Sequence, residues 1–512
     1  MAAAAQKVPN RLLITVCAMV ATLMQALDST IANVALPYMQ GSLSATSDQI
    51  TWVLTSYIVA AAIMTAPVGW LSARFGRKKL FIACLVGFTI ASMLCGVAQS
   101  LEQMVLFRLL QGMFGAALVP LSQATMLDIY PPEQRGSAMA MWGVGVMVGP
   151  ILGPTLGGYL TDLYNWRYVF YVNLPFGVLA TAGLMLFLPA SKSQSSLRFD
   201  WLGFGVLALG LGSFQLMLDR GQDQDWFGSR EIIIDSVLAG LGIYLFVVHL
   251  LTAEKPFLSP RLFKDRNFAA SLAVMFSVGM ILLASSALLA PWLQVLANYP
   301  VATAGLVLAP RGLGTMAAMI ISGRLTSKMD PRWLMALGIS LLSYSLYRQT
   351  GWTPDVDSWT VIINTVIQGA GLGFVFIPLQ VIAFATLAPE LRTDATSLLS
   401  LLRNVGSAVG VSATSALLAH NIQVAHADLA ARVTPFTGLA RGTDAAGQLL
   451  DPTSAKGAAL LDSMINQQAT IIAYLDDFKA MLLVTLPAVL LLLLMRRPRA
   501  ASAPDPAHAA MD

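Results

Sequence analysis

One acidic residue, Asp28, lies inside the first long apolar segment, within the string Leu27–Pro37. A charge at the bilayer centre costs about 3 kcal/mol by insertion measurements, so such a residue must face the protein interior or a water-filled cavity. Because burial disfavours the ionised carboxylate, Asp28 is a candidate for taking up and releasing a proton. A carboxylate fixed by structural hydrogen bonds is the alternative interpretation.

A positive charge, Arg108, lies inside another apolar segment. Arginine keeps its proton, so a buried guanidinium needs a partner, and either hydrogen-bond acceptors or Asp28 could serve. The alternative is that the side chain reaches to the nearby membrane boundary. We predict a proton-coupling role for Asp28 and Arg108. Polar side chains that we consider candidates for lining a substrate cavity are Gln25, Asn33, Gln111, Gln123 and Gln368.

Glycines recur every four residues in the string Gly145–Gly158, where they form one stripe on a helix. Small residues at this spacing let a second helix backbone approach closely. Pro150 removes a helical hydrogen-bond donor and favours a bend. Tight packing alone explains the spacing as well as a functional seal or hinge does. The predicted motif comprises Gly145, Gly149, Pro150, Gly153 and Gly157.

The string Gly69–Lys79 concentrates four positive charges between two apolar segments, and a weaker copy runs over residues 323–332. The simplest explanation is topology, since loops on the cytoplasmic side are rich in Lys and Arg. Two further embedded charges, Arg311 and Arg403, have no partner that the sequence identifies. The residues that we predict for a cytoplasmic gating loop are Gly69, Arg74, Gly76, Arg77 and Asp128.

The elements that must position these residues are membrane-spanning helices. Of the 512 residues, 56% are hydrophobic and only 11% are charged, whereas soluble domains carry about 25% charged residues. Runs of about 20 apolar residues predict spans, and the fold class is therefore an all-α membrane protein with 14 transmembrane helices. The predicted spans are 12–35, 50–71, 80–100, 103–127, 136–161, 166–188, 201–219, 232–252, 268–290, 302–326, 332–351, 358–386, 393–420 and 478–496.

The distribution of basic residues predicts the orientation. With the N-terminus inside, 20 Lys and Arg residues fall at cytoplasmic segments and 4 at short outer segments, as the positive-inside rule requires. Both termini are then cytoplasmic. Residues 421–476 are predicted to be the only long outer loop, and residues 500–512 a disordered tail.

The sequence repeats itself at an offset of 257 residues, so that Gln111 matches Gln368 and Gly149 matches Gly406. A same-direction repeat fits two six-helix halves related by an axis along the membrane normal. The predicted organisation is a first half over residues 1–190, two additional helices over 191–262, and a second half over 263–499.

Enzyme motifs are missing from the sequence. It has no H-E-x-x-H string, no G-x-S-x-G string and no nucleotide-binding G-x-x-x-x-G-K-[ST] loop. The three cysteines and four histidines show no metal-ligand spacing. We therefore expect a protein that is not an enzyme, with no metal and no cofactor other than a proton gradient.

These strings together resemble the major facilitator superfamily, and within it the fourteen-span drug:proton antiporters. The antiporter motif of that family is partly met, because Gly145, Gly149, Pro150 and Gly153 match while Pro154 replaces a glycine. The resemblance implies that Asp28 binds the proton. The acidic residue of the family's loop motif is replaced by Ala73, so we expect Asp128 to pair with Arg74 or Arg77 instead.

The resemblance also implies the function. It predicts a proton-driven antiporter that exports hydrophobic drugs and toxic small molecules from the cytoplasm or inner leaflet across a bacterial inner membrane. It further implies a periplasmic adaptor and an outer-membrane channel as partners. The alternative within transport is a facilitator-type symporter or uniporter.

Overall fold

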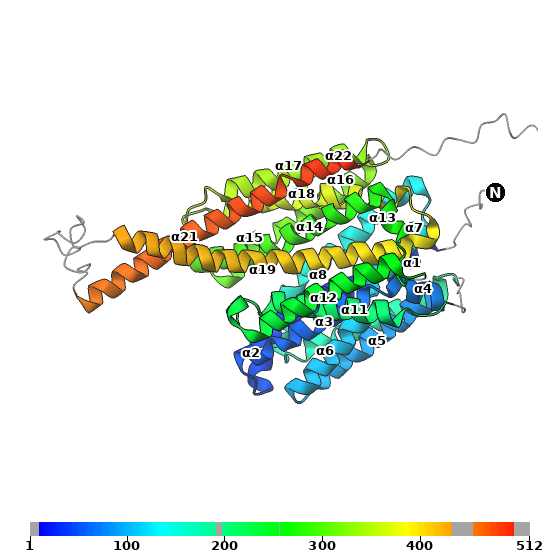
Figure 1. Cartoon of the computed structure of the whole chain (residues 1–512), viewed down its shortest axis with the longest axis horizontal. Coiled ribbons are helices and arrows are strands. Elements are labelled where there is room, and N and C mark those ends of the chain that lie inside the picture. The colour runs from blue at the N-terminus through cyan, green and yellow to red at the C-terminus, as the bar shows by residue number, and fades with distance from the viewer. Residues whose placement is uncertain (1–9, 191–196, 255, 433–453, 496–512) are drawn as a thin grey trace, which may run out of the picture.

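The computed structural model describes residues 10–190, 197–254, 256–432 and 454–495, and these residues form helices and connecting segments without a strand (Figure 1). The first half contains α1 (Arg11–Ser42), α2 (Ser47–Ile50), α3 (Trp52–Thr65), α4 (Val68–Phe75), α5 (Arg77–Val97), α6 (Leu101–Gly115), α7 (Leu118–Ile129), η1 (Pro132–Gln134), α8 (Arg135–Leu163), α9 (Tyr168–Tyr171) and α10 (Asn173–Phe187).

The remaining helices follow in chain order. The middle of the chain contributes α11 (Trp201–Arg220), η2 (Trp226–Gly228) and α12 (Arg230–Thr252). The second half contains α13 (Arg261–Lys264), α14 (Arg266–Pro291), η3 (Trp292–Leu296), α15 (Val301–Leu308), α16 (Pro310–Leu325), α17 (Pro331–Gln349), α18 (Ser358–Ala385), η4 (Pro389–Leu391), α19 (Arg392–Arg432), α21 (Ala455–Thr485) and α22 (Ala488–Leu494).

A helix lies at each of the fourteen predicted spans, but not all of them are apolar throughout. Among the described residues, 11 helical segments are long and apolar enough to cross a membrane, or 12 if the pair α3 and α4, bent by 58°, is one span. Helices α17 and α19 fall short because polar and charged side chains interrupt their apolar faces. The protein is thus an all-helical, multi-pass membrane protein, and hydropathy alone does not give fourteen spans.

Local sequence explains where several helices begin. The side chain of Ser100 accepts a hydrogen bond from the Gln103 amide at the start of α6, and Asp265 accepts one from Phe268 at the start of α14. These caps satisfy amides that have no partner inside the helix. Gly76 has a φ of 85° between α4 and α5, which glycine adopts without steric cost. The chain can therefore turn sharply at the basic string Gly69–Lys79.

The two halves pair their helices in the same pattern. In the first half α1 packs on α8, α3 on α6, and α5 on α6. In the second half α14 packs on α19, α16 on α18, and α17 on α18. Figure 1 shows the second half lying alongside the first, with α19 running between them, while α11 and α12 pack on each other and α11 contacts α3.

The described part of the predicted outer loop 421–476 is helical. Helix α19 continues to Arg432, and α21 begins at Ala455, so both helices extend beyond the other helices at one end of the molecule (Figure 1). Asn421 donates a hydrogen bond to Asp477 over 3.3 Å, and His426 lies 3.0 Å from Asp462. These contacts join the polar ends of α19 and α21 to each other.

Asp477 is a second buried carboxylate within a long helix, in addition to Asp28. The Asp477 side chain in α21 is 0% exposed. Asp477 directly follows the predicted loop 421–476, so its burial was not predicted. Three segments lie outside the described part of the chain: the first nine residues, residues 433–453 of the predicted loop, and the predicted tail 500–512.

Candidate functional site

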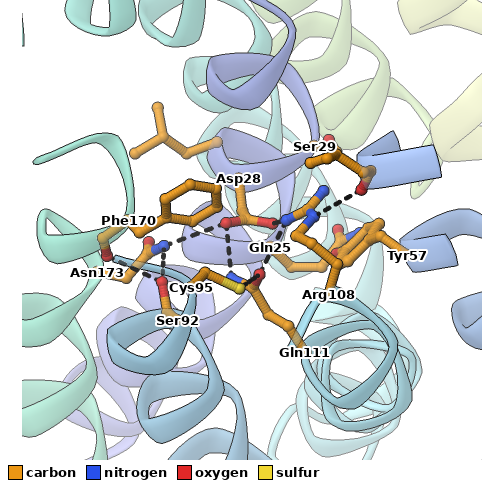
Figure 2. A network of polar contacts seen from close by, with 12 residues as sticks. Gln25, Asp28, Ser29, Tyr57, Ser92, Cys95, Arg108, Gln111, Phe170 and Asn173 are labelled. Atoms are coloured by element: carbon orange, nitrogen blue, oxygen red, sulfur yellow. Dashed lines mark hydrogen bonds and ion pairs between the residues drawn. The ribbon is translucent and has the colours of Figure 1, made fainter. Parts of the chain in front are cut away.

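Asp28 and Arg108 form a buried ion pair at the centre of the first half. Arg108 donates from Nη1 to Oδ2 of Asp28 over 2.7 Å, and the two side chains are 1% and 0% exposed (Figure 2). This burial contradicts the alternative that Arg108 reaches to the membrane boundary. Removing one partner of such a pair leaves an uncompensated buried charge, so each group holds the other in place.

Amide side chains complete the shell around the Asp28 carboxylate. Gln111 donates from Nε2 to Oδ1 of Asp28 over 2.7 Å, and Asn173 donates from Nδ2 to the same atom over 3.3 Å. Gln111 also accepts a hydrogen bond from Arg108 over 2.9 Å. Asn173 in turn donates to Ser92 over 3.0 Å. Helices α1, α5, α6 and α10 therefore converge on one carboxylate (Figure 2).

Arg108 is held on its other side by α3. Its Nε donates to the carbonyl oxygen of Val53 over 3.0 Å, and its guanidinium carbon lies 4.2 Å from the centre of the Tyr57 ring. Gln25 donates to the Tyr57 hydroxyl over 3.3 Å. A guanidinium over an aromatic face gains cation–π energy. These contacts hold the arginine in place independently of Asp28.

The other candidates for a substrate cavity lie outside this network. Asn33 is exposed on α1. Gln368 on α18 is 0% exposed, and neither of its amide atoms has a hydrogen-bond partner within the described part of the chain. Although Gln368 matches Gln111 in the repeat, no described carboxylate hydrogen-bonds to it. Gln123 on α7 is buried at the boundary between the halves and is described below.

The glycine stripe packs α8 against the turn of α1 that carries Asp28. A methyl group at Gly149 would lie 2.7 Å from the Ala26 Cβ and 2.9 Å from the Leu27 amide nitrogen. Gly153 lies against Thr30 in the same way. Helix α8 continues through Pro150 to Leu163 as one helix. The predicted motif therefore brings two helix backbones together directly beside the buried carboxylate.

The opposite face of α8 contacts the second half. Gly136 packs against Thr326, and a methyl group at Gly143 would lie 2.7 Å from the Met319 sulfur of α16. Gly312 of α16 packs on Ile151 of α8. Helix α8 is thus packed closely on both sides, with α1 on one face and α16 of the second half on the other.

A charged cluster joins the halves at the end of the molecule where α1 begins, which we call the N-terminal end. Asp128 pairs with Arg77, one of its two expected partners, and also accepts a hydrogen bond from Arg392 of the second half over 2.7 Å. Arg77 donates to the Thr393 hydroxyl over 3.1 Å. Arg74 does not pair with Asp128, and its buried Nη1 has no hydrogen-bond partner among the residues that the structure describes.

The backbone at Gly69 leaves room for a residue of the second half. Asp394, in the first turn of α19, lies where a Cβ on Gly69 would stand. An acidic residue near a helix N-terminus is stabilised by the helix dipole. Asp394 of the second half therefore lies directly against the backbone of Gly69 in the first half, beside the bond between Asp128 and Arg392 that also joins the halves.

A small gap between the halves lies farther along the same boundary. It has about 0 Å³ of free volume for a water molecule and is lined by Gln123, Met275, Phe376, Gln380, Leu399, Ser400 and Arg403. Drug-sized ligands occupy pockets of about 300–1,000 Å³. This part of the boundary is therefore packed too tightly to hold such a molecule.

Sequence reasoning missed several members of these clusters. Tyr57, Ser92 and Asn173 contribute to the Asp28 network, and Arg392 and Asp394 contribute to the N-terminal cluster. Asn173 was detectable as an amide inside an apolar run. The others carried no signal, because a tyrosine, a serine or a residue at a helix start is ordinary in sequence.

Known proteins resemble this chain over most of its length. The Major Facilitator Superfamily family model matches residues 18–422. The multidrug export protein EmrB of Escherichia coli K12 is 36% identical over 91% of this chain and 91% of its own length. The fatty acid resistance protein FarB of Neisseria gonorrhoeae is 35% identical over 90% of this chain and 91% of its own length.

Solved structures agree on the fold. The human organic anion transporter MFSD10 superposes with a TM-score of 0.58 at 15% identity, covering 93% of this chain and 100% of that one. A bacterial homologue of the human lysosomal transporter Spinster, in an inward-facing and occupied conformation, gives 0.54 at 17% identity, covering 95% and 97%. The expected family is therefore confirmed: this chain belongs to the major facilitator superfamily, a family of membrane transporters and not of enzymes.

Proposed function

We propose that this protein is a proton-driven antiporter that exports hydrophobic drugs and toxic small molecules from the cytoplasm or the inner leaflet. The observation that carries the proposal is the buried Asp28–Arg108 pair, which is packed against the glycine stripe of α8. A carboxylate that gains a proton loses its attraction to the guanidinium 2.7 Å away. Proton binding can therefore change the packing of α1.

Helix α8 offers a route from that change to the boundary between the halves. It contacts α1 through Gly149 and Gly153, and α16 through Gly136 and Gly143. Because glycine contacts leave no side chain to absorb a shift, a movement of α1 must displace α8 or separate from it. The proposal is that protonation of Asp28 biases the rocking of the halves that alternating access requires.

The described conformation fits a state closed at the N-terminal end. Helices α4 and α7 of the first half contact α19 there, and Asp128 bridges Arg77 and Arg392. In our proposal this end faces the cytoplasm, in accord with the excess of basic residues on that side. Protons would then arrive at Asp28 from the outer side, and substrate would leave in the same direction.

The proposed architecture is fourteen spans arranged as six, two and six, with both termini cytoplasmic, in the inner membrane of a bacterium. The matching helix pairs of the two halves support this division. Helices α17 and α19 count as spans in this arrangement because each packs along an apolar neighbour, α18 and α14 respectively. Helices α11 and α12 are the additional pair.

The substrate class and partners rest on similarity. The names of EmrB and FarB describe multidrug export and fatty acid resistance, which supports hydrophobic small molecules as substrates. A periplasmic adaptor and an outer-membrane channel complete the proposal. Co-purification of the full-length protein with such an adaptor from its native membrane tests this part separately.

The test of coupling replaces Asp28 by Asn in the full-length protein, reconstituted into vesicles with an imposed pH gradient. Asp28→Asn should abolish gradient-driven transport while preserving substrate exchange without a gradient. Asp477→Asn is the matched control, because it neutralises another buried carboxylate, 0% exposed, that lies outside the site. Undiminished gradient-driven transport by Asp28→Asn, or its loss only in Asp477→Asn, contradicts the mechanism.

Reversing the pH gradient tests the alternative of a symporter or uniporter. An antiporter accumulates substrate on the side with more protons, whereas a symporter accumulates it on the side with fewer. A uniporter responds to neither gradient.

A further inference from the structure

An arginine begins one long helix in each half of the chain. Arg135 is the first residue of α8 and Arg392 is the first residue of α19, and each follows a short 3-10 helix, η1 or η4. The two arginines are 257 residues apart, which is the offset of the internal repeat. Equivalent positions of the two halves therefore place a positive charge at a helix N-terminus.

Both arginines lie at the boundary between the halves, at the N-terminal end. Arg392 reaches across the boundary and donates to Asp128 over 2.7 Å. Gly136, which follows Arg135, packs against Thr326 of the second half. The charge of Arg135 interacts with that of Arg392 and with that of Asp128. The starts of α8 and α19 therefore bring their arginines to one place on the boundary.

Three guanidinium groups at this place have donors that no protein group accepts. The buried Nε atoms of Arg77, Arg135 and Arg392 lack a hydrogen-bond partner within the described part of the chain. Arg77 and Arg392 share Asp128 through their Nη1 atoms, whereas Arg135 forms no ion pair with any described residue. Arg392 as a whole residue is only 9% exposed. Because a buried charged donor is costly to leave unbonded, these three residues, the arginine cluster, require a further acceptor.

Two arginines elsewhere in the chain have the partners that Arg135 lacks. Arg108 is paired within the candidate site at 2.7 Å. Arg311 donates to Ser286 over 2.6 Å and to Ser285 over 2.9 Å. Protein groups satisfy these two guanidiniums, and they do not satisfy that of Arg135.

The arginine cluster also has an excess of positive charge. Asp128 and Glu133 oppose it, so two negative charges stand against three positive ones. Asp394 lies against the backbone of Gly69 and forms no ion pair within the described residues. An acceptor that carries negative charge satisfies the free donors and balances the charge at the same time, whereas a water molecule does only the first.

We propose that the arginine cluster binds a phosphate-bearing anion, which bridges Arg135 of the first half and Arg392 of the second half. Guanidinium groups bind phosphate oxygens through paired, charge-assisted hydrogen bonds. A helix N-terminus attracts the same group, and α8 begins without a side-chain cap. The anion adds a second link between the halves beside the bond from Arg392 to Asp128, and it stabilises closure of the N-terminal end. This inference goes beyond the proposed export function and does not depend on it.

The test measures thermal unfolding of the purified full-length protein in detergent with two probes. One is inorganic phosphate, which replaces chloride at constant ionic strength, and the other is phosphatidylglycerol, with phosphatidylcholine as the lipid of zero net charge. The unfolding temperature of the wild type should rise with the probe and reach a plateau, because a ligand of the folded state stabilises it by mass action. Arg135→Gln should weaken the apparent affinity at least about tenfold, since one charged hydrogen bond accounts for that ratio.

Further variants test the bridge and its specificity. Arg392→Gln should weaken binding as well, and an unchanged affinity in that variant would overturn the bridge between the halves. Arg332→Gln is the matched control, because it removes a positive charge that is already paired with Asp330, and it should bind the probe like the wild type. An equal rise in unfolding temperature for all variants would be a general salt effect and would overturn the proposal.

The unfolding temperature without a probe separates binding from a structural role. Since Arg135 has no ion pair with a described residue, Arg135→Gln should unfold at the same temperature as the wild type or higher. A marked fall would show that Arg135 stabilises the fold itself and would contradict the proposal.

The two probes identify the source of the anion. If the ligand is a soluble phosphate compound, inorganic phosphate stabilises the wild type without any added lipid. If the ligand is an anionic lipid, phosphatidylglycerol stabilises the wild type but not Arg135→Gln, and phosphate adds nothing. Stabilisation by neither probe overturns the proposal. Because no substrate or pH gradient is present, this result is independent of coupling through Asp28.

Discussion

Arg392, in the second half of the chain, donates a hydrogen bond from Nη1 to Oδ1 of Asp128 in the first half over 2.7 Å. The two side chains are 11% and 35% exposed, so the contact is partly shielded from solvent. Asp128 simultaneously pairs with Arg77. One carboxylate therefore links two basic residues on opposite halves, and opening the N-terminal end must break the bond to Arg392.

Replacing Arg392 by Gln should favour the conformation that is open at the N-terminal end. A partly exposed ion pair contributes about 1 kcal/mol, which shifts a two-state equilibrium about fivefold. The measurement is the alkylation rate of a cysteine introduced at Thr326, which packs against Gly136 at this end. The rate should rise several-fold.

The control for the Arg392 experiment is Asp330→Asn. Asp330 pairs with Arg332, which is only two residues away in the same half. The substitution weakens an ion pair of the same type that does not join the halves. An equal rise in alkylation for Asp330→Asn would mean that the effect is not specific to the cross-half bond.

Arg108→Gln should destabilise the protein by about 3–5 kcal/mol, because Asp28 is left buried without its cation. The double variant Asp28→Asn/Arg108→Gln should be closer to the wild type, since neither charge remains. Thermal unfolding of the four proteins in detergent measures this coupling. Additive losses in the double variant would show that the two residues act independently, despite the 2.7 Å contact.

Gly149→Ala should lower the unfolding temperature and abolish transport. The added methyl group would lie 2.7 Å from the Ala26 Cβ, and overpacking of this kind costs about 1–3 kcal/mol. Gly158→Ala, on the same helix, is the matched control because nothing lies within 4 Å of its Cβ position. Two equally stable and equally active variants would show that close contact between α8 and α1 is not required.

A cysteine at Asp462 should react with a membrane-impermeant maleimide added to intact cells, and a cysteine at Ser327 should react only after permeabilisation. Asp462 is 60% exposed on the extended part of α21. Helix α19 has 41 residues and so spans about 60 Å, against about 30 Å of hydrocarbon.

The labelling experiment starts from a variant in which Cys17, Cys84 and Cys95 are replaced, although two of these are buried. The opposite labelling pattern would reverse the proposed orientation. Labelling of both positions from outside would contradict the span count between residues 327 and 462.

The sequence predicted the components of the candidate site better than their arrangement. Asp28 and Arg108 stood out because a charge in an apolar run is costly, and that cost depends only on local composition. Tyr57 and Asn173 reach the same carboxylate from helices far away in the chain. Their types and neighbours in sequence are unremarkable, so only packing reveals their part.

The sequence by itself determined that the chain is a helical membrane protein, because a long apolar run can satisfy its backbone in lipid only as a helix. It also determined the repeat and the close approach of a glycine-striped helix. The tertiary structure decided which partners these features meet. It placed α8 between Asp28 and the second half, and it set Asp394 of the second half against the backbone of Gly69. Such relationships depend on contacts between residues distant in sequence, which local pattern does not specify.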